Sequence, residues 1–493
     1  MPLRPLNREQ TWLLPPSLDE MIPLDHPARF VAAVVDAIGP AEWMELGVAP
    51  EGEALGAPAY HPRALLSVWL YGFMTRIRSS RKLEAACRDQ MPYLWLTGWQ
   101  HPDHNTLWRF YQQHRSRMRE LLKRTVRIAV EMGLLNMAVQ AVDGTKVVAN
   151  VDKHRTYNAE ELTKLLKDTE AAIQNLEHQN EEGVDPPPPH LPQKLAKAER
   201  LRAEVKAALE RLGRERRKHI NLTDGDARFI KTRQGVAPGY NAQVVVSAVG
   251  SPEVTESNGK RKASLLITAA NVVTNTTDTA QLMPMLEQAE ENVGKRSGVS
   301  LADAGYHSGA NLEACRLRQH VVLMPESQER ALEQPYHKDK FSYDKAADSY
   351  ICPRGQPLNF KHIRITKKGT SVRVYRAAGS VCRNCPAFGI CTRSDEGRIL
   401  EVSPEDAVLR QHRAWMATEQ AKADYSKRKE LAEPVFAIIK EQMGLRRFSL
   451  RGLVKVTSEF VMVATAFNLL TLWRFACRLG GYKPLSTVMG IPT

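Results

Sequence analysis

Hydrophobic residues recur every three to four positions through the first 135 residues of the chain. This spacing places them on one face of a helix. Polar breaks at residues 78–81 (RSSR) and 100–105 (QHPDHN) divide the segment in the manner of a helix-turn-helix bundle. The pattern predicts an all-helical N-terminal domain, residues 1–135, in which Asp103 or Asn105 caps the last helix. Its helices are expected at residues 26–38, 61–77, 81–90 and 104–133.

At Met137 the pattern changes to alternating or continuous apolar residues. MAVQAVD (137–143) followed by TKVVANV (145–151) predicts a hairpin of two strands. Strands first, then helices alternating with strands, predict a mixed sheet with helices packed against it over residues 136–334. The other strands are expected at 241–249, 263–270, 298–303 and 320–325, and the helices at 279–293 and 309–318.

Two insertions interrupt this core, and the whole is a mixed α+β protein. Residues 155–218 hold two charged helical stretches separated by DPPPPH (185–190), which no helix can pass through. They predict a protruding helical hairpin, either a dimerisation arm or a solvated insertion. Residues 335–400 contain a cysteine cluster and a basic strand-like hairpin at 361–376. The core then resumes over residues 401–493, with helices expected at 405–443 and 457–478.

The net charge of the chain indicates which class of partner it binds. A net charge of +14 and a pI near 9.4 favour nucleic acid, because lysine and arginine on phosphates release condensed counterions. The basic side chains of the N-terminal helices form either a solvated face or a surface that grips phosphates. They are Arg76, Arg78, Arg81, Lys82, Arg88, Arg115, Arg117, Arg119, Lys123, Arg124 and Arg127.

No segment has the pattern of a signal peptide or a membrane span. The longest apolar run, residues 460–473, contains Asn468 and predicts a buried helix. Seven cysteines in a chain of 493 residues do not make a disulfide scaffold. We therefore expect a protein of the reducing cytoplasm with no membrane partner.

Three acidic residues lie at positions where they could bind metal ions. Asp143 and Asp303 each follow an apolar strand and precede a glycine-containing turn, so both carboxylates would face out of the core. Taken singly, each is also what an ordinary turn contains. Glu433 and Lys440 lie seven residues apart on a predicted helix and so share a face, although a solvated amphipathic helix would show the same pattern.

As a unit, the three carboxylates suit the cutting and joining of DNA. Two divalent ions about 3.5–4 Å apart activate the nucleophile and stabilise the leaving oxygen of a phosphodiester. Oxygen ligands suit Mg²⁺ or Mn²⁺. Carboxylates about 4 Å apart repel by roughly 4 kcal/mol per pair at an effective dielectric constant of about 20. Such a cluster is expected to need bound cations for its order.

The cysteines form a second constellation, because four of the seven lie within one 40-residue segment. A CxxC knuckle with two further cysteines matches a closed, structural Cys₄ zinc site, and reduced, partly buried thiols are the alternative. Residues 335–400 would then be a zinc-ribbon-like insertion that touches DNA. The proposed ligands are Cys352, Cys382, Cys385 and Cys391, whereas Cys87, Cys315 and Cys477 are isolated and expected to be buried.

Histidines are the other candidate metal ligands, but none has a recognisable ligand spacing. His101, His104, His307 and His337 all lie in turn-like contexts, and we expect none of them to bind metal. His307 is expected nearest the acidic site, because it follows Asp303 closely.

The order of these motifs resembles the insertion-sequence transposases of the DDE type, which have a ribonuclease H-like core. The elements that carry the resemblance are Asp143 on a first strand, Asp303 followed by GYHS (305–308), and Glu433 in a Y-R-E-K pattern. Further matching pieces are NLTDGDARF (221–229), GYNAQVVV (239–246), TNTTDTAQL (274–282), EPVFAIIK (433–440) and PDHNTLWRF (102–110). The resemblance extends over essentially the entire chain.

The resemblance implies a transposase in which Asp143, Asp303 and Glu433 bind Mg²⁺ or Mn²⁺. Tyr425, Arg428 and Lys440 would grip phosphates or steady the transposon end. Four residues separate Arg428 from Glu433 where the best-known signature has three, so Lys429 is an alternative to Arg428 in this role.

The implied substrate is double-stranded DNA, both the terminal inverted repeats of the element and the target. The N-terminal domain would bind the repeats, and the chain would assemble as at least a homodimer on paired ends. The DNA contacts are expected at Arg78, Arg81, Lys82, Arg115 and Arg119.

Two other functions remain open. One is a sequence-specific DNA-binding protein whose nuclease site has decayed, and the presence of all three acids with Tyr425 and Lys440 argues against it. The other is a metal-dependent nuclease that cuts without joining.

Overall fold

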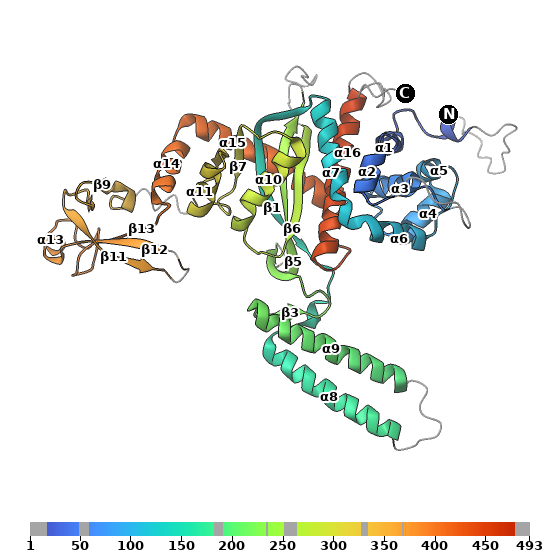
Figure 1. Cartoon of the computed structure of the whole chain (residues 1–493), viewed down its shortest axis with the longest axis horizontal. Helices are drawn as coiled ribbons and strands as arrows, with labels where there is room; N and C mark the ends of the chain where they lie inside the picture. The colour runs from blue at the N-terminus through green and yellow to red at the C-terminus, as the bar shows by residue number, and fades with distance from the viewer. Residues whose placement is uncertain are drawn as a thin grey trace, which may run out of the picture.

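The computed structural model describes residues 17–48, 59–181, 191–232, 235–250, 264–326, 334–366, 369 and 371–478. A central mixed sheet carries the N-terminal helices on one side and a smaller cysteine-bearing sheet at the far side, while a long helical hairpin projects away from both (Figure 1). The DPPPPH segment lies outside the described residues.

Six strands form the central sheet. Five of them are ordered β6-β5-β1-β7-β8. Strand β5 is antiparallel to its neighbours β6 and β1, whereas β7 and β8 run parallel to β1. The sixth strand, β4, pairs with the first part of β5. This is the strand arrangement of a ribonuclease H-like core, so the predicted mixed α+β class is confirmed. The bounds are β1 (Leu135–Val148), β4 (Arg228–Thr232), β5 (Gly235–Val249), β6 (Ser264–Val273), β7 (Val299–Ala302) and β8 (Val322–Leu323).

The hairpin predicted over residues 137–151 is wrong, because β1 runs straight through Asp143 and Gly144. These two residues pair with Val244 and Gln243 of β5. Glycine is required here for space, since a Cβ at Gly144 would collide with the side chain of Gln243 and lie 2.8 Å from Oδ1 of Asp278. The Asp-Gly pair therefore marks a close approach inside a sheet and not a turn.

Helices cover both faces of the sheet. Alternate residues of β5 separate into two cores: Val244 and Val246 face one side, and Val245 faces the other. The first side packs against the N-terminal helices and the two C-terminal helices α15 (Glu419–Ala437) and α16 (Leu453–Arg478), and the second against α10 (Leu282–Val293) and α11 (Gly309–Leu317). Because both faces are covered, the strand can be as continuously apolar as its sequence is.

The N-terminal helices share the first of these cores with the sheet. The single helix expected over residues 104–133 is wrong, since it is broken into α6 and α7 by a 3₁₀ turn at Arg115–Arg117. The buried positions His114 and Met118 keep the four-residue spacing across the break, which is why the hydrophobic pattern does not reveal it. Asp103 caps α6 by accepting from the Thr106 N–H at 2.7 Å. The described elements are η1 (Leu18–Met21), α1 (Pro27–Asp36), α2 (Pro40–Glu45), α3 (Pro62–Met74), α4 (Ser80–Asp89), α5 (Met91–Thr97), α6 (His104–His114), η2 and α7 (Arg119–Glu131).

Helix α16 is apolar and long enough to cross a membrane by length and composition, but 72% of its most apolar window is buried inside the protein. Its N-terminus is held by the loop that contains the NLTDGD motif. Asp224 accepts from the Gly452 N–H at 3.1 Å, and Asp226 accepts from the Leu453 N–H at 2.7 Å. Two carboxylates at the positive end of a helix are favourable. The motif thus has a structural role here, fixing the main core helix.

The two insertions each have a small core of their own. The helical hairpin consists of α8 (Ala159–Glu181) and α9 (Leu191–Glu215), with η3 (Lys153–Arg155), β2 (Thr156–Tyr157) and β3 (Ile220–Asn221) at its base. The second insertion is a five-stranded antiparallel sheet in the order β13-β12-β11-β10-β9, with the basic hairpin confirmed as β11 and β12. Its elements are η5 (Lys338–Lys340), β9 (Ser342–Asp344), β10 (Ser349–Ile351), β11 (Pro357–Ile365), β12 (Ser371–Ala377), α13 (Gly379–Arg383) and β13 (Ile399–Val402), followed by α14 (Asp406–Met416).

The free edge of β6 is closed by one side chain of α16. A bulge at Thr268 shifts the register of β6 on β5. On the open side, the Asn468 side chain accepts from the Ile267 N–H at 2.8 Å and donates to its carbonyl at 2.8 Å, while also donating to Oγ1 of Thr125 at 2.9 Å. One buried amide thereby satisfies a peptide group that has no strand partner.

We expect Asn468→Leu to lower the free energy of unfolding by about 2–4 kcal/mol, because the Ile267 peptide is left buried without partners. Urea unfolding followed by circular dichroism measures this change. Val454→Ala on the same helix, at a side chain 67% exposed, should change stability by less than about 0.5 kcal/mol. An Asn468→Leu protein as stable as the wild type would contradict this account of the sheet edge.

Candidate active site

Two acidic residues lie side by side at the edge where β1 and β7 meet. Val142 pairs with Ala302 in parallel register, so the residues that follow, Asp143 and Asp303, are neighbours on adjacent strands. Adjacent strands are about 4.8 Å apart. Asp303 comes directly after β7, and its carboxylate accepts from the Gly305 N–H at 2.9 Å. Asp143 lies within β1, on the face that packs against α15.

Arg428 of α15 joins the two aspartates. Its guanidinium donates to Oδ2 of Asp143 at 3.0 Å and lies 3.9 Å from Oδ2 of Asp303. The Arg428 and Asp143 side chains are 14% and 13% exposed, and Asp303 is 39% exposed, so the pair opens towards solvent on the Asp303 side. The structure therefore brings Arg428 to the acids, while Lys429 is exposed.

A third aspartate, which the sequence reasoning did not single out, lies beside these two. Oδ1 of Asp278 accepts from Asn241 at 2.6 Å, from Gln243 at 2.7 Å and from Nζ of Lys146 at 3.2 Å. A Cβ at Gly305 would lie 3.0 Å from Oδ1 of Asp303 and 3.5 Å from Oδ2 of Asp278, so both carboxylates approach this one glycine.

Neighbouring groups fix this arrangement. The hydroxyl of Tyr306 donates to Oε1 of Gln243, and the hydroxyl of Thr279 donates to the Gly305 carbonyl at 2.9 Å. The signal for Asp278 was present in the sequence, because the motifs TNTTDTAQL and GYNAQVVV contain both Asp278 and its partners. Only the fold shows that the two motifs meet.

The cluster has more negative than positive charge. Three carboxylates, of Asp143, Asp278 and Asp303, face two cations, Lys146 and Arg428. Burial raises the pKa of Asp143 to about 6, with Asp303 and Asp278 acting in the same direction and Arg428 and the Gly144 N–H opposing it. A protein site that holds surplus buried carboxylate charge is one that an added cation would stabilise.

Glu433 lies on α15, five residues and therefore about 7.5 Å along the helix axis from Arg428. Its side chain is exposed, and it forms no hydrogen bond or ion pair with the described residues. The structure thus places Glu433 on the helix that contacts the aspartates, without joining it to them. Tyr425 packs against the main core, and Lys440 lies half-exposed on the π-helical turn η6 (Ile438–Gln442) that follows Pro434.

Most basic residues of the N-terminal helices remain on the surface, but several are engaged in holding the fold, among them Arg117, which donates to the Met44 carbonyl at 3.1 Å. Arg78 pairs with buried Glu459 at 3.8 Å, Lys123 with Glu291 at 2.8 Å, and Arg124 with Glu42. The side chains that remain exposed include Arg76, Arg81, Lys82, Arg88, Arg117, Arg119 and Arg127, while Arg115 is half-buried.

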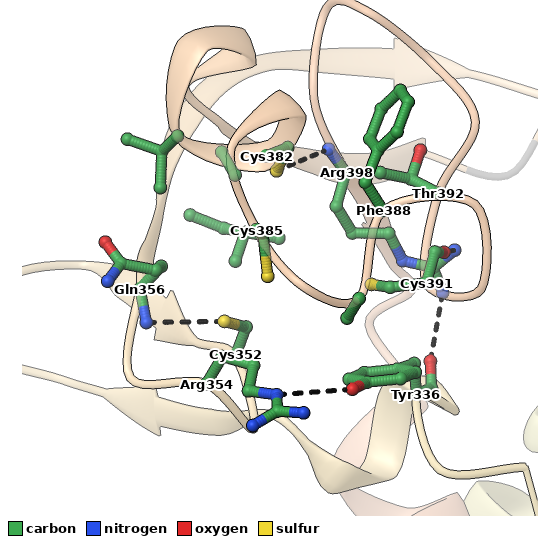
Figure 2. A pocket seen from close by; sticks show the side chains of 14 residues that line it. Tyr336, Cys352, Arg354, Gln356, Cys382, Cys385, Phe388, Cys391, Thr392 and Arg398 are labelled. Carbon is green, nitrogen blue, oxygen red and sulfur yellow. Dashed lines mark hydrogen bonds between the residues drawn. The ribbon is translucent and has the colours of Figure 1, made fainter.

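The four clustered cysteines line one small cavity of about 30 Å³ (Figure 2). Cys352 follows β10, Cys382 lies on α13, and Cys385 and Cys391 lie in the loop after it. Backbone N–H groups donate to two of the sulfurs, Gln356 to Cys352 at 3.3 Å and Arg398 to Cys382 at 3.4 Å. Donors aimed at sulfur favour its thiolate form.

The three other cysteines are separate from this cavity, with Cys87 and Cys315 buried and Cys477 half-buried. The ring of His307 lies beside the ring of His412 on α14, with the centroids 5.8 Å apart and the ring planes tilted by 49°. Within the ranges that the structure describes, no three or more histidine, cysteine, aspartate or glutamate side chains are arranged as a ready ligand set for a metal ion.

Comparison with known protein families gives two matches. Residues 351–473 match the family described as Transposase DDE domain, and residues 16–113 match the Transposase domain (DUF772). The first range contains Glu433 and the cysteine cluster, whereas Asp143 and Asp303 lie outside both ranges. No curated protein and no solved structure matches the chain.

The ribonuclease H-like sheet and the DDE-domain match define the class: a nucleic-acid enzyme of the DDE type. Within that class, both matched domains are transposase domains, and the two matches support a bacterial insertion-sequence DDE transposase.

The burial of Asp143 beside two further carboxylates predicts how pH affects the stability of the metal-free protein. The pKa of Asp143 is raised from 3.8 in the unfolded chain to about 6 in the fold. The stability that this shift contributes is present below about pH 4 and is lost as the pH rises through about 6.

Asp143→Asn should therefore raise the free energy of unfolding at pH 8 by about 2–3 kcal/mol, and at pH 5 the gain should fall to about half. Thermal unfolding in metal-free buffer at both values measures it. Asp89→Asn, at an exposed carboxylate, provides the matched control. If Asp143→Asn and the wild type are equally stable at pH 8, the ionised Asp143 carboxylate does not destabilise the folded protein.

Proposed function

We propose that this transposase cleaves DNA at the ends of its element and joins the freed 3′-hydroxyl to target DNA. The observation that carries the proposal is the pairing of Asp143 with Asp303 on adjacent strands under Arg428 of α15. This pair lies in a ribonuclease H-like sheet of a chain that matches the Transposase DDE domain.

Asp143, Asp303 and Glu433 would hold divalent cations, Mg²⁺ or Mn²⁺. The donor set fits, because its ligands are carboxylate oxygens and the cluster has more negative than positive charge. When bound, a pair of such ions supplies an activated nucleophile and a stabilised leaving oxygen. Glu433 would complete the set by turning from its exposed position on α15 towards the aspartates.

The remaining residues of the site would orient these acids and the DNA. Arg428 holds the two aspartates together, and its guanidinium is a donor that a scissile phosphate could share. Asp278, fixed by Asn241, Gln243 and Lys146, keeps a further carboxylate against the Asp303 turn. We assign it a positioning role.

DNA would be bound by the positive charge of the chain. Tyr425 and Lys440 on α15 and η6 would contact the strand beside the acids, and the exposed N-terminal residues Arg81, Lys82 and Arg119 would hold the terminal repeat. With about six to ten phosphate contacts, binding should weaken about 10³- to 10⁵-fold between 50 and 200 mM salt. Two chains on paired ends would form the active assembly.

Asp143→Asn, Asp303→Asn and Glu433→Gln should each lower the rate of end cleavage by about 10³-fold or more, while the affinity for the end stays within about threefold. Asp278→Asn should lower cleavage by about tenfold. The assay is purified protein with Mg²⁺, a labelled duplex of the element's terminal sequence and a target plasmid.

Glu430→Gln is the matched control for Glu433→Gln, because it removes an exposed carboxylate three residues away on the same helix. It should cleave as the wild type does. The products also separate the alternatives: binding without cleavage indicates a decayed site, and cleavage without joined product indicates a nuclease.

The four clustered cysteines would hold one structural Zn²⁺ that stiffens the second insertion. Their shared cavity and the N–H groups directed at two sulfurs support this, and a closed thiolate set suits zinc. The basic hairpin β11–β12 belongs to the same small sheet and would be ordered with it.

Protein purified without chelator should therefore contain about one zinc per chain, measured by mass spectrometry of the metal. Cys385→Ser should lose most of it. Cys477→Ser, at a half-buried cysteine on α16, should keep it. Wild-type protein without zinc after growth in zinc-containing medium would refute the assignment.

A further inference from the structure

An exposed basic patch lies at the neck of the helical hairpin, where the end of α9 meets strand β4 of the central sheet (Figure 1). The ring of His219, just before β3, lies against the ring of Phe229 on β4, with the centroids 5.3 Å apart. This contact holds the segment that follows α9 against the β4–β5 hairpin. The neck patch consists of the exposed side chains of Arg216, Lys218, His219, Phe229, Lys231 and Val236.

The fold uses only the middle one of three consecutive basic residues in this segment. Arg217 is 5% exposed and donates to the carbonyls of Gly225 and Ala227. Arg216 and Lys218, on either side of it, are exposed, and their side chains form no hydrogen bond or ion pair with the described residues. Their charges therefore have no part in holding the neck together.

No free carboxylate neutralises the patch from within its own segments. The one acidic residue of segments 214–221 and 228–232 is Glu215, and three arginines pair with it. Lys231 on β4 is exposed and has no ion pair among the residues that the structure describes. Unneutralised cations around an exposed aromatic ring, Phe229 at 41% exposure, favour an anionic partner.

Arg216 adopts a backbone conformation that favours glycine. Its φ of +50° is in the left-handed region, directly after the end of α9. Glycine is the usual residue at such a helix end, and a side chain there costs stability. The negative end of α9 favours nearby cations, but Lys231 lies on a strand and has no such reason to be basic. A binding role accounts for both residues.

Strand β5 connects the patch to the acidic site. Val236 pairs with Lys231, Val244 pairs with Asp143, and the register of β5 is unbroken between them. Residues eight positions apart in a strand face the same side of the sheet, so Lys231 and Asp143 share that face. Eight residues span at most about 27 Å, which is less than the roughly 34 Å of one turn of B-DNA.

We infer that the neck patch binds the phosphate backbone of the target duplex, within one helical turn of the acidic site. The inference rests on the proposed function, since it names where the DNA that receives the element is held. The patch offers charge and an apolar ring but no amide side chain, and phosphate contacts carry no sequence information. Such a surface suits a target whose sequence the element does not fix, whereas the N-terminal domain holds the terminal repeat.

The test compares cleavage with joining in the triple variant Arg216→Gly/Lys218→Ala/Lys231→Ala, called the neck variant. Joining should fall about tenfold or more, because three phosphate contacts to the target are lost, while end cleavage stays within about twofold. The assay is the purified full-length chain with Mg²⁺, a labelled duplex of the element's terminal sequence and a target plasmid. Both products are measured on one gel.

Two controls separate binding from folding and from overall charge. The melting temperature of the neck variant should not fall, because glycine is the residue that the end of α9 favours. The triple variant Lys164→Ala/Lys167→Ala/Arg200→Ala removes three exposed cations further along the same hairpin and should join as the wild type does. A loss of joining in this control equal to that of the neck variant would overturn the placement of the target on the neck.

Salt dependence gives a second readout that needs no catalysis. The affinity for a random-sequence duplex is measured without divalent metal, by fluorescence anisotropy over a range of salt concentrations. The slope of log affinity against log salt should be shallower by about 2.7 in the neck variant, as expected for three lost phosphate contacts. An unchanged slope would contradict phosphate binding by the patch.

The outcomes distinguish this inference from the proposed function. Joining by the neck variant at the wild-type rate overturns the inference and leaves the proposed function standing. A loss of end cleavage as large as the loss of joining also overturns it, because the patch would then hold the terminal duplex. A wild-type chain that cleaves ends but joins no target overturns the proposed function, and the salt slope then decides by itself whether the patch binds DNA.

Discussion

The arrangement of the site depends on the contact between the Arg428 guanidinium and the carboxylates of Asp143 and Asp303. It joins α15, from the C-terminal part of the chain, to two strands encoded some 125 to 285 residues earlier. Without a cation between them, the two carboxylates on adjacent strands would repel each other. Arg428, together with the buried face of α15 that includes Leu431 and Val435, therefore places this helix and its Glu433 relative to the sheet.

Helix α16 stabilises the core behind this contact. Asn468 closes the free edge of β6, and Glu459 accepts from the Ser449 and Leu450 N–H groups while pairing with Arg78 of the N-terminal helices. Asp224 and Asp226 hold its first turn from the base of the helical hairpin. The N-terminal helices, the sheet and the hairpin are thus connected through one buried helix, so DNA held by the first would be positioned for the acids of the second.

The two insertions are organised differently from the core. Each has its own small hydrophobic cluster, and the second is tied to α14 by ion pairs of Asp339 with Arg410 and Arg413 and of Lys338 with Asp406. Polar connections of this kind fix a position without merging the cores. Helix α13, which carries Cys382, lies at the end of the small sheet that points away from the central sheet (Figure 1).

The sequence by itself determined the class of the fold, the family and most of the elements, because hydrophobic period and short motifs are local properties. It identified α16 as a buried helix and β11–β12 as a hairpin. Tertiary structure alone decided that Gly144 lies inside a strand, that α6 and α7 are separate helices, and that Asp278 joins the acidic cluster. Each of these depends on side chains from distant segments: Gln243 and Asp278 fill the space at Gly144, and Ser458 of α16 donates to the Arg115 carbonyl at the helix break. Such contacts leave no periodic signal in the chain.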